Sequence, residues 1–272
     1  MQSVKISEKN KLIFLKMSKN ISLKQFLMGS GRFERSYDCI AAIKDGKATI
    51  DNEIITHPNH FFNPKKSLVR LYDEKVKPLP KLYFLLNKPS GYLCQKSTSE
   101  KTVYDLLKKL NLPKASKQSL YTVGRLDKDT EGLLIITNDG KLSNTITNPK
   151  NEIVKRYYVV LEKQIDPEKI KALEKGIEIS IGRERYKTKS CKIEIVGEKN
   201  AYISISEGRK RQIKKMFDAI GNKVIYLRRV SIGNIQLEKL KIGEFKEISR
   251  EEIYKNLLNR FKKAISNLFK QQ

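Results

Sequence analysis

The chain has 272 residues, 39% of them hydrophobic and 32% charged, which is enough for one large domain or two smaller domains with buried cores. Its 56 Lys and Arg residues outnumber 30 Asp and Glu residues, and the resulting net charge of +26 predicts a polyanionic partner, foremost a nucleic acid. The sequence contains no run of 18 apolar residues and no signal peptide, so we expect a cytoplasmic protein that binds no membrane.

Metal binding is not expected from the cysteines and histidines. The three cysteines are far apart and form neither a metal-ligand spacing nor a disulfide framework. His57 and His60 lie in a turn-like stretch without cysteine or carboxylate neighbours, which makes a poor zinc site.

The N-terminal part of the chain begins with a polar, Lys-rich stretch, residues 1–20, which we interpret as a basic arm. Apolar residues at helical spacing then predict a short helix from Ile21 and a second helix that begins at Ser36 and ends at Gly46. Strands are predicted at residues 48–50, 54–55 and 68–71, with a turn at Asp51 and Asn52 between the first two.

This order of helix, helix, glycine, strand, turn and strand resembles the alpha-L RNA-binding domain first known from a small-subunit ribosomal protein. Residues 35–54 carry the resemblance most clearly, and we place the domain at residues 21–75. A solvated basic surface is the alternative interpretation of its cations. The resemblance implies a phosphate-contacting face that is formed by Lys24, Arg32, Arg35, Lys44 and Lys47.

A Pro-containing linker, residues 76–81, separates this domain from an alternation of strands and helices. Strands are predicted at residues 82–86, 133–137, 153–161, 191–196, 202–206, 224–227 and 230–235. Helices are predicted from Thr102 to about residue 110, from Asp139 to about residue 146, from Asp166, over residues 209–220, and as an amphipathic C-terminal helix within residues 249–272. The pattern predicts an α+β fold with a large mixed or antiparallel sheet.

The charged loop before the strand at residues 133–137 is the first candidate for a catalytic site. Gly124 and Gly132 bracket it, and Asp127 lies between Arg125 and Lys128. Neighbouring cations keep a carboxylate ionised, so Asp127 is available as a nucleophile or base. The alternative is an Asp in an ordinary turn.

The order of residues in this loop, Arg125-Leu126-Asp127 followed by Thr130, Gly132-Leu133-Leu134, Thr137 and Asp139-Gly140, resembles the catalytic motif of the pseudouridine synthases that modify ribosomal RNA. Further parts of the pattern are present in chain order. They are Lys88-Pro89-Ser90-Gly91, Lys155-Arg156-Tyr157-Tyr158-Val159, residues 207–217 and residues 227–233. We therefore assign residues 82–248 to a pseudouridine synthase catalytic domain.

Roles follow from the resemblance, position by position. Asp127 is the expected catalytic carboxylate, with Asp129 as its competitor; Tyr157 stacks on the target base, and Lys214 pairs with Asp127. Arg125 fills the gap that the flipped base leaves, and Ile213 packs under the base. Arg209 and Arg211 are expected to hold phosphates, and Lys88 belongs to the first motif among the substrate-binding positions. Ordinary strand tyrosines and a solvated basic helix are the alternatives.

The resemblance implies isomerisation of uridine to pseudouridine in ribosomal RNA by base flipping, without a metal or other cofactor. The expected partner is ribosomal RNA or an assembling ribosomal particle, and the expected state is a monomer. Two alternatives remain. One is a non-catalytic RNA-binding ribosome-assembly factor. The other is a DNA-binding protein, although no helix-turn-helix or zinc pattern is found.

Overall fold

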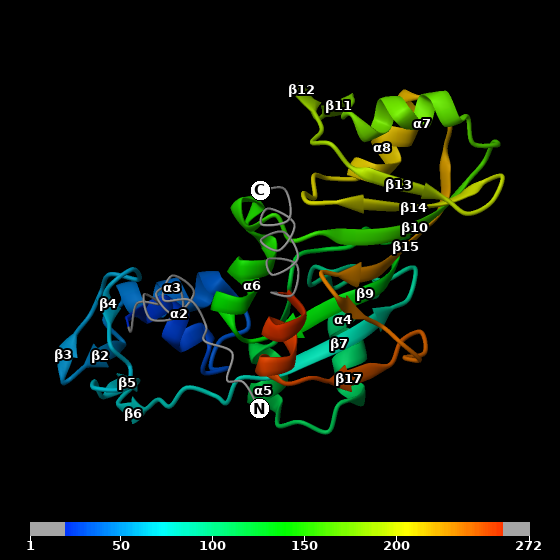
Figure 1. Cartoon of the computed structure of the whole chain (residues 1–272). Helices are drawn as coiled ribbons and strands as arrows, with labels where there is room; N and C mark the ends of the chain where they lie inside the picture. Colours follow the sequence, from blue (N-terminus) through cyan, green and yellow to red (C-terminus); the bar gives the residue numbers. More distant parts are fainter. Residues whose placement is uncertain (1–19, 258–272) are drawn as a thin grey trace, which may run out of the picture. The chain divides into compact units, whose positions relative to one another are not determined.

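The computed structural model describes residues 20–257, which form parts of two compact units (Figure 1). The first unit comprises Met1–Pro80 and Leu112–Ser119, and the second comprises Lys81–Asn111 and Leu120–Gln272. Residues 112–119 therefore belong with the first unit, although the sequence analysis assigned them to the catalytic domain. The predicted arm at residues 1–19 lies outside the described residues, and the predicted C-terminal helix is described from Arg250 to Leu257.

The first unit contains three short helices and two small sheets around an apolar core. Ser22 caps the first helix, and positive φ angles at Asp51 and Asn52 form the tight hairpin turn that the sequence predicts. Leu23, Leu27 and Ile43 are fully buried between helices and sheet. Its elements are β1 (Ile21–Ser22), α2 (Leu23–Met28), α3 (Ser36–Lys44), β2 (Ala48–Ile50), β3 (Glu53–Ile54), β4 (Phe61–Phe62), β5 (Val69–Leu71), β6 (Glu74–Lys75) and α5 (Lys114–Ser119).

The second unit is built on a 9-stranded sheet. Seven of its strands follow the order β13-β14-β10-β15-β9-β7-β17, and the other two, β16 and β8, pair with β15 and β9 respectively. The pair of β15 and β9 is parallel and the other pairs are antiparallel, so the predicted α+β fold with a large mixed sheet is confirmed. The strands are β7 (Tyr83–Lys88), β8 (Tyr121–Thr122), β9 (Glu131–Thr137), β10 (Lys155–Leu161), β13 (Lys192–Ile195), β14 (Asn200–Ile205), β15 (Val224–Ile232), β16 (Ile235–Gln236) and β17 (Phe245–Glu247).

Helices and one hairpin cover this sheet. In Figure 1, α7, α8 and the hairpin lie together beside β13 and β14, and α6 lies beside the strands of the other half. Asp139 and Asp166 cap α6 and α7 through their side chains, as their positions predict. The elements are α4 (Val103–Leu106), η1 (Leu107–Lys109), α6 (Gly140–Thr147), η2 (Pro149–Asn151), α7 (Pro167–Glu174), α8 (Gln212–Ala219), and the hairpin strands β11 (Glu178–Ile181) and β12 (Glu184–Lys187).

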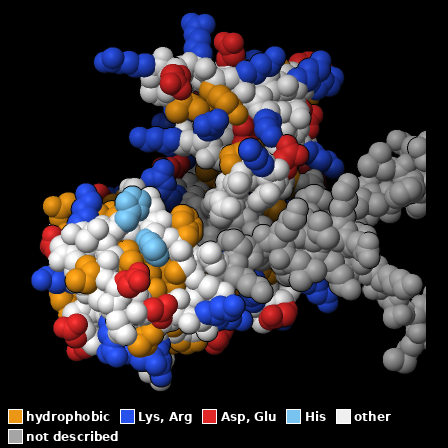
Figure 2. Space-filling view, turned by 90° about the vertical axis from the view of Figure 1, so that its left-hand side faces the viewer, with side chains coloured by type: hydrophobic (Ala, Val, Ile, Leu, Met, Phe, Trp, Pro, Cys, Tyr) orange, Lys and Arg blue, Asp and Glu red, His pale blue; other side chains and the backbone are white. Residues whose placement is uncertain are grey.

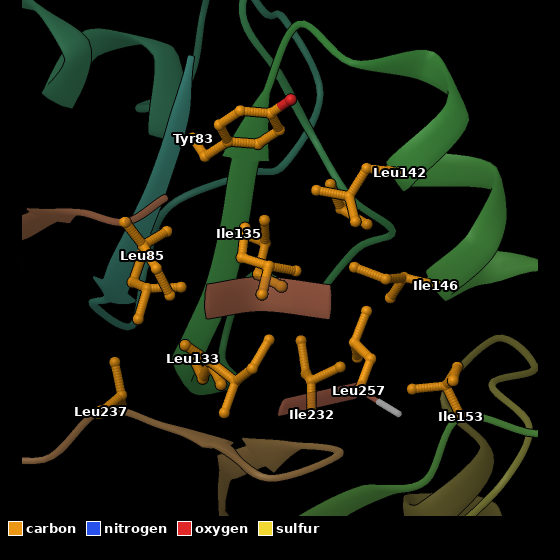
Figure 3. Packing of buried hydrophobic residues seen from close by; sticks show 14 residues of the cluster. Tyr83, Leu85, Leu133, Ile135, Leu142, Ile146, Ile153, Ile232, Leu237 and Leu257 are labelled. Atoms are coloured by element: carbon orange, nitrogen blue, oxygen red, sulfur yellow. The ribbon is translucent and has the colours of Figure 1, made fainter. Parts of the chain in front are cut away.

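The core of the second unit surrounds β9. Leu133 and Ile135 point from this strand toward Leu142 and Ile146 of α6, as Figure 3 shows. The fully buried strand residues 133–136 explain the continuous apolar run in the sequence, because a strand covered on both faces needs no alternation. The charged loop that precedes β9 is thereby attached to a rigid support.

Two predictions of element boundaries in the second unit are corrected, and one hairpin was missed. Helix α8 begins at Gln212 instead of residue 209, because Arg211 has a φ of 53° and cannot continue a right-handed helix. The two strands predicted at residues 224–235 are one long strand, β15, followed by the short β16. The hairpin of β11 and β12 was not predicted, since its largely exposed strands lack an apolar pattern.

Candidate active site

Four residues from four strands, two of which are predicted site residues, lie in one row across the large sheet. Tyr157 of β10 pairs with Arg229 of β15, Arg229 pairs with Gly132 of β9, and Gly132 pairs with Lys88 of β7. Tyr157 and Arg229 are antiparallel partners, so their side chains lie on the same face of the sheet. Both are largely buried, with 7% and 3% of their surfaces exposed. The loop with Asp127 enters this row from the start of β9.

Gly132 determines how closely β9 and β15 approach. Its φ is 103°, and an added Cβ would lie 2.2 Å from the carbonyl oxygen of Arg229. A side chain is therefore excluded both by backbone conformation and by contact with the neighbouring strand. The glycine that ends the predicted catalytic loop is required by the packing of the sheet.

Lys88 holds the loop that carries Asp127 in place. Its Nζ donates hydrogen bonds to four carbonyl oxygens, those of Pro89 at 3.0 Å, Asp127 at 3.2 Å, Lys128 at 3.2 Å and Thr130 at 2.9 Å. The side chain is fully buried, and this burial lowers its pKa. The expected role of Lys88 as a substrate contact is therefore corrected: the amine is enclosed by the loop that carries Asp127.

Two further bonds join the same segments. The backbone N–H of Gly91 donates to the carbonyl oxygen of Lys128 at 2.8 Å. The backbone N–H of Leu126 donates to Sγ of the buried Cys94 at 3.4 Å. Together with Lys88, these bonds hold the backbone on both sides of Asp127.

Lys214 makes an ion pair with Asp129, and this differs from the expected pairing with Asp127. The Lys214 side chain is 11% exposed, whereas that of Asp129 is 60% exposed. Burial alone raises the pKa of Asp129, but the hydrogen bond and charge of Lys214 outweigh it, so the pKa lies below its ordinary value. The pair joins α8 to the loop that carries Asp127.

Asp127 and Arg125 remain accessible on that loop. Asp127 is half-buried and Arg125 is exposed, while Leu126 between them is buried and anchors the loop. The backbone N–H of Thr130 donates to the carbonyl oxygen of Asp127 at 3.0 Å and closes a turn around the carboxylate. An accessible carboxylate on a fixed backbone is suited to attack or proton removal on a bound nucleotide.

Lys155 adds a further cation near this row. It lies two residues before Tyr157 on β10, and its Nζ donates to the carbonyl oxygen of Ile153 at 3.1 Å. Burial, and secondarily the charge of Arg229, lowers its pKa to about 8.

The segment before α8 is fixed by the buried carboxylate of Glu207. It accepts hydrogen bonds from the Tyr186 hydroxyl at 2.6 Å, the Lys189 backbone at 2.9 Å and Gln212 at 2.5 Å. Arg209 is exposed, and its guanidinium lies 4.5 Å from the centre of the Tyr186 ring. Arg211 is exposed at the N-cap of α8, and Ile213, two residues later, is 4% exposed.

The five predicted RNA-binding cations lie on and around α2 and α3 of the first unit. Lys24 is in α2, Lys44 ends α3 and Lys47 precedes β2. Arg32 pairs with Glu74 at 2.9 Å and Arg35 with Asp38 at 2.8 Å. Figure 2 shows cations, acids and apolar side chains mixed on one face, with the two histidines side by side.

Within residues 20–257, no three His, Cys, Asp or Glu side chains gather as a metal site, and no helix is long and apolar enough to cross a membrane.

The family model described as RNA pseudouridylate synthase matches residues 82–219. The chain belongs to this family. An RNA pseudouridine synthase from Bacillus subtilis (strain 168) is 38% identical over 243 residues, which cover 87% of this chain and 98% of the relative. The family assignment makes this protein an isomerase that acts on RNA.

Other relatives of this pseudouridine synthase also match most of the chain, and a solved structure has the same fold. The ribosomal small subunit pseudouridine synthase A of Escherichia coli (strain K12) is 35% identical over 212 residues, covering 78% of this chain and 89% of the relative. A crystal structure of a pseudouridylate synthase is 32% identical, covers 87% of this chain and 99% of that chain, and has a TM-score of 0.62. The fold match spans the whole of that solved chain.

Several residues at the site of this synthase were missed or given another role in the sequence analysis. Arg229 was noted only as part of a continuing pattern, although a charged residue within a strand of buried apolar residues is a detectable signal. Asp129 was named as a competitor of Asp127 and proves to be the partner of Lys214. Cys94 and Glu207 gave no sequence signal of their contacts, because both contacts join segments far apart in the chain.

Proposed function

We propose that this synthase isomerises a specific uridine in ribosomal RNA to pseudouridine, with Asp127 as the catalytic carboxylate. The observation that carries the proposal is the placement of Asp127 on an accessible loop whose backbone is held by Lys88, directly before the row that contains Tyr157. The named relatives with a known substrate class are ribosomal small subunit enzymes, which supports ribosomal RNA as the substrate.

Each group has a task in the reaction. The uridine leaves the base stack, at a cost of a few kcal/mol, and its base stacks on Tyr157 with Ile213 beneath it. Asp127 assists cleavage of the glycosidic bond, the base turns, and its carbon five bonds to the ribose while losing a proton. Arg125 fills the vacated position in the RNA, and Arg209 and Arg211 hold phosphates.

Lys214 contributes charge from the side of α8. Its pairing with Asp129 leaves the Asp127 carboxylate free of that ion pair in the RNA-free protein. The five cations of the first unit contact phosphates away from the target nucleotide. We also propose that the enzyme acts as a monomer in the cytoplasm on ribosomal RNA or an assembling ribosomal particle.

Tritium release from ribosomal RNA labelled at uracil carbon five tests the proposal, because the transferred base loses that hydrogen. Wild type and Asp127→Asn are compared on naked RNA and on assembling particles, and the modified position is mapped afterwards. Release by the wild type alone is expected. Absence of release from both substrates, with tight RNA binding retained, would instead indicate a non-catalytic ribosome-assembly factor.

A further inference from the structure

Arg229 has a buried hydrogen-bond donor for which the described protein supplies no acceptor. Its Nε donates to the carbonyl oxygen of Leu133 at 2.7 Å, which fixes the guanidinium against β9. Its Nη2 is buried and has no hydrogen-bond partner. Buried polar atoms are nearly always satisfied, and a charged donor left without an acceptor is costly, so an acceptor from a ligand is the simplest explanation.

Lys88 in the same row provides a contrast. Both are buried cations within residues 20–257, and Lys88 is 0% and Arg229 3% exposed. Nζ of Lys88 donates to four carbonyl oxygens, so its capacity is used by the protein itself. The guanidinium of Arg229 is instead held through Nε by Leu133, and its Nη2 has no acceptor among the described residues.

The position of Arg229 indicates which group that is. It is the direct antiparallel partner of Tyr157, so the two side chains leave the sheet on the same face with their Cβ atoms about 5 Å apart. A base stacked flat on the Tyr157 ring directs its edge toward such a neighbour. The hydrogen-bond acceptors on the edge of uracil are its carbonyl oxygens.

We propose that Arg229 is a substrate-binding residue that donates a hydrogen bond from Nη2 to a carbonyl oxygen of the flipped uracil. The inference rests on the proposed uridine isomerisation. Because Nη2 is enclosed in the free protein, the contact belongs to the RNA-bound state, in which the entering base displaces the side chains around it. Thr130 directly precedes β9, and its Oγ1 is also buried without a hydrogen-bond partner. The same region therefore contains a second polar atom whose hydrogen-bonding capacity is unused in the absence of RNA.

Arg229→Gln and Arg228→Gln form a matched pair for the test. Arg228 is the adjacent residue on β15, and its Nε is also buried without a partner, but its side chain lies on the opposite face of the sheet. The substrate is an RNA fragment containing the uridine mapped by the tritium experiment. We expect kcat/KM to fall by about 10- to 100-fold in Arg229→Gln, and by far less in Arg228→Gln.

A second measurement separates a base contact from a structural role. The target uridine is replaced by 2-thiouridine or 4-thiouridine, since sulfur is a weaker acceptor than oxygen. One of the two should slow the wild type several-fold and should slow Arg229→Gln no further. Thermal unfolding midpoints report any loss of fold, and Arg229→Lys replaces Arg229→Gln if the latter does not fold.

Equal kcat/KM for wild type and Arg229→Gln would overturn the inference, as would a thio effect of the same size in both proteins. If neither Arg229 variant folds, unchanged rates of the wild type with both thio substrates would overturn it. Turnover of the wild type on the unmodified fragment is measured in the same series. Absence of release from the fragment, from full-length ribosomal RNA and from assembling particles would refute the proposed function and is thus distinguishable from failure of the Arg229 contact.

Discussion

Lys214 in α8 is paired with Asp129, two residues beyond Asp127 in the same loop. The loop therefore holds two carboxylates with different surroundings, one bound to a cation and one without that pair. This division supports the proposal that Asp129 positions α8 and that Asp127 carries out the chemistry.

The two carboxylates are expected to differ sharply on substitution. Asp127→Asn should abolish measurable tritium release while RNA affinity stays within a few-fold. Asp129→Asn should reduce the rate by about ten-fold and barely change stability, because pairs with one exposed partner contribute only about 0–1 kcal/mol. Single-turnover assays and binding titrations on both variants check this. Activity in Asp127→Asn equal to wild type would refute the assignment.

Lys88→Met should destabilise the second unit and inactivate the enzyme. The substitution removes the donor to four carbonyl oxygens and leaves buried acceptors unsatisfied, which costs about 2–4 kcal/mol. Denaturant unfolding and tritium release measure the two effects. Lys128→Met is the control, since the Lys128 side chain is 53% exposed and forms an exposed ion pair with Glu100, and it should leave stability within about 0.5 kcal/mol. Similar stability of the two variants would contradict the role of Lys88.

Lys155 gives a prediction for pH. Its folded-state pKa of about 8 lies below the ordinary value of 10.5, so the folded protein disfavours the charged form. The full stability is present above pH 10.5, and it is lost as the pH falls through the range down to about 8. Lys155→Met removes this penalty and should stabilise the protein at pH 7 by about 1–3 kcal/mol. Unfolding experiments from pH 7 to 10 should show the gain shrinking with rising pH, and a constant gain would exclude this cause.

The basic face of the first unit should appear in the salt dependence of RNA binding. Lys24, Lys44 and Lys47 form no salt bridge with any described residue, so their charges are available to phosphates. Replacing all three with Gln should reduce the slope of log K against log salt by about 2–3 on duplex RNA, if each loses one phosphate contact. The double substitution of the exposed Lys65 and Lys66 with Gln is the control. If the slope changed by the same amount per substituted residue in both variants, RNA would not be binding to one particular face of the first unit.

Features encoded by neighbouring residues could be predicted from the sequence. Asp139 and Asp166 cap their helices, and the tight turn at Asp51 and Asn52 forms, because each depends on a few adjacent residues. The position of Asp127 before a buried strand was also predicted, since the apolar run at residues 133–136 is unambiguous. Contacts between segments that are far apart in the sequence could not be predicted in this way.

The errors at the site have physical causes. Lys88 was placed among the substrate-binding positions because it belongs to the first motif, and only the fold shows the carbonyl oxygens that compensate its burial. Asp127 and Asp129 are two residues apart, and sequence spacing does not decide which carboxylate reaches Lys214. Arg229 is defined as a site residue only by its register with Tyr157.

The parallel pairing of β9 and β15 consists of two residue pairs, Arg228 with Glu131 and Arg229 with Gly132. It is the seam between the half of the sheet that carries Asp127 and the half that carries Tyr157. Side chains reinforce it, since Tyr226 donates to Glu131 at 2.8 Å and Arg229 donates to Leu133 at 2.7 Å. The spacing between the loop that carries Asp127 and the strand that carries Tyr157 therefore depends on this short pairing and on the two side-chain hydrogen bonds across it.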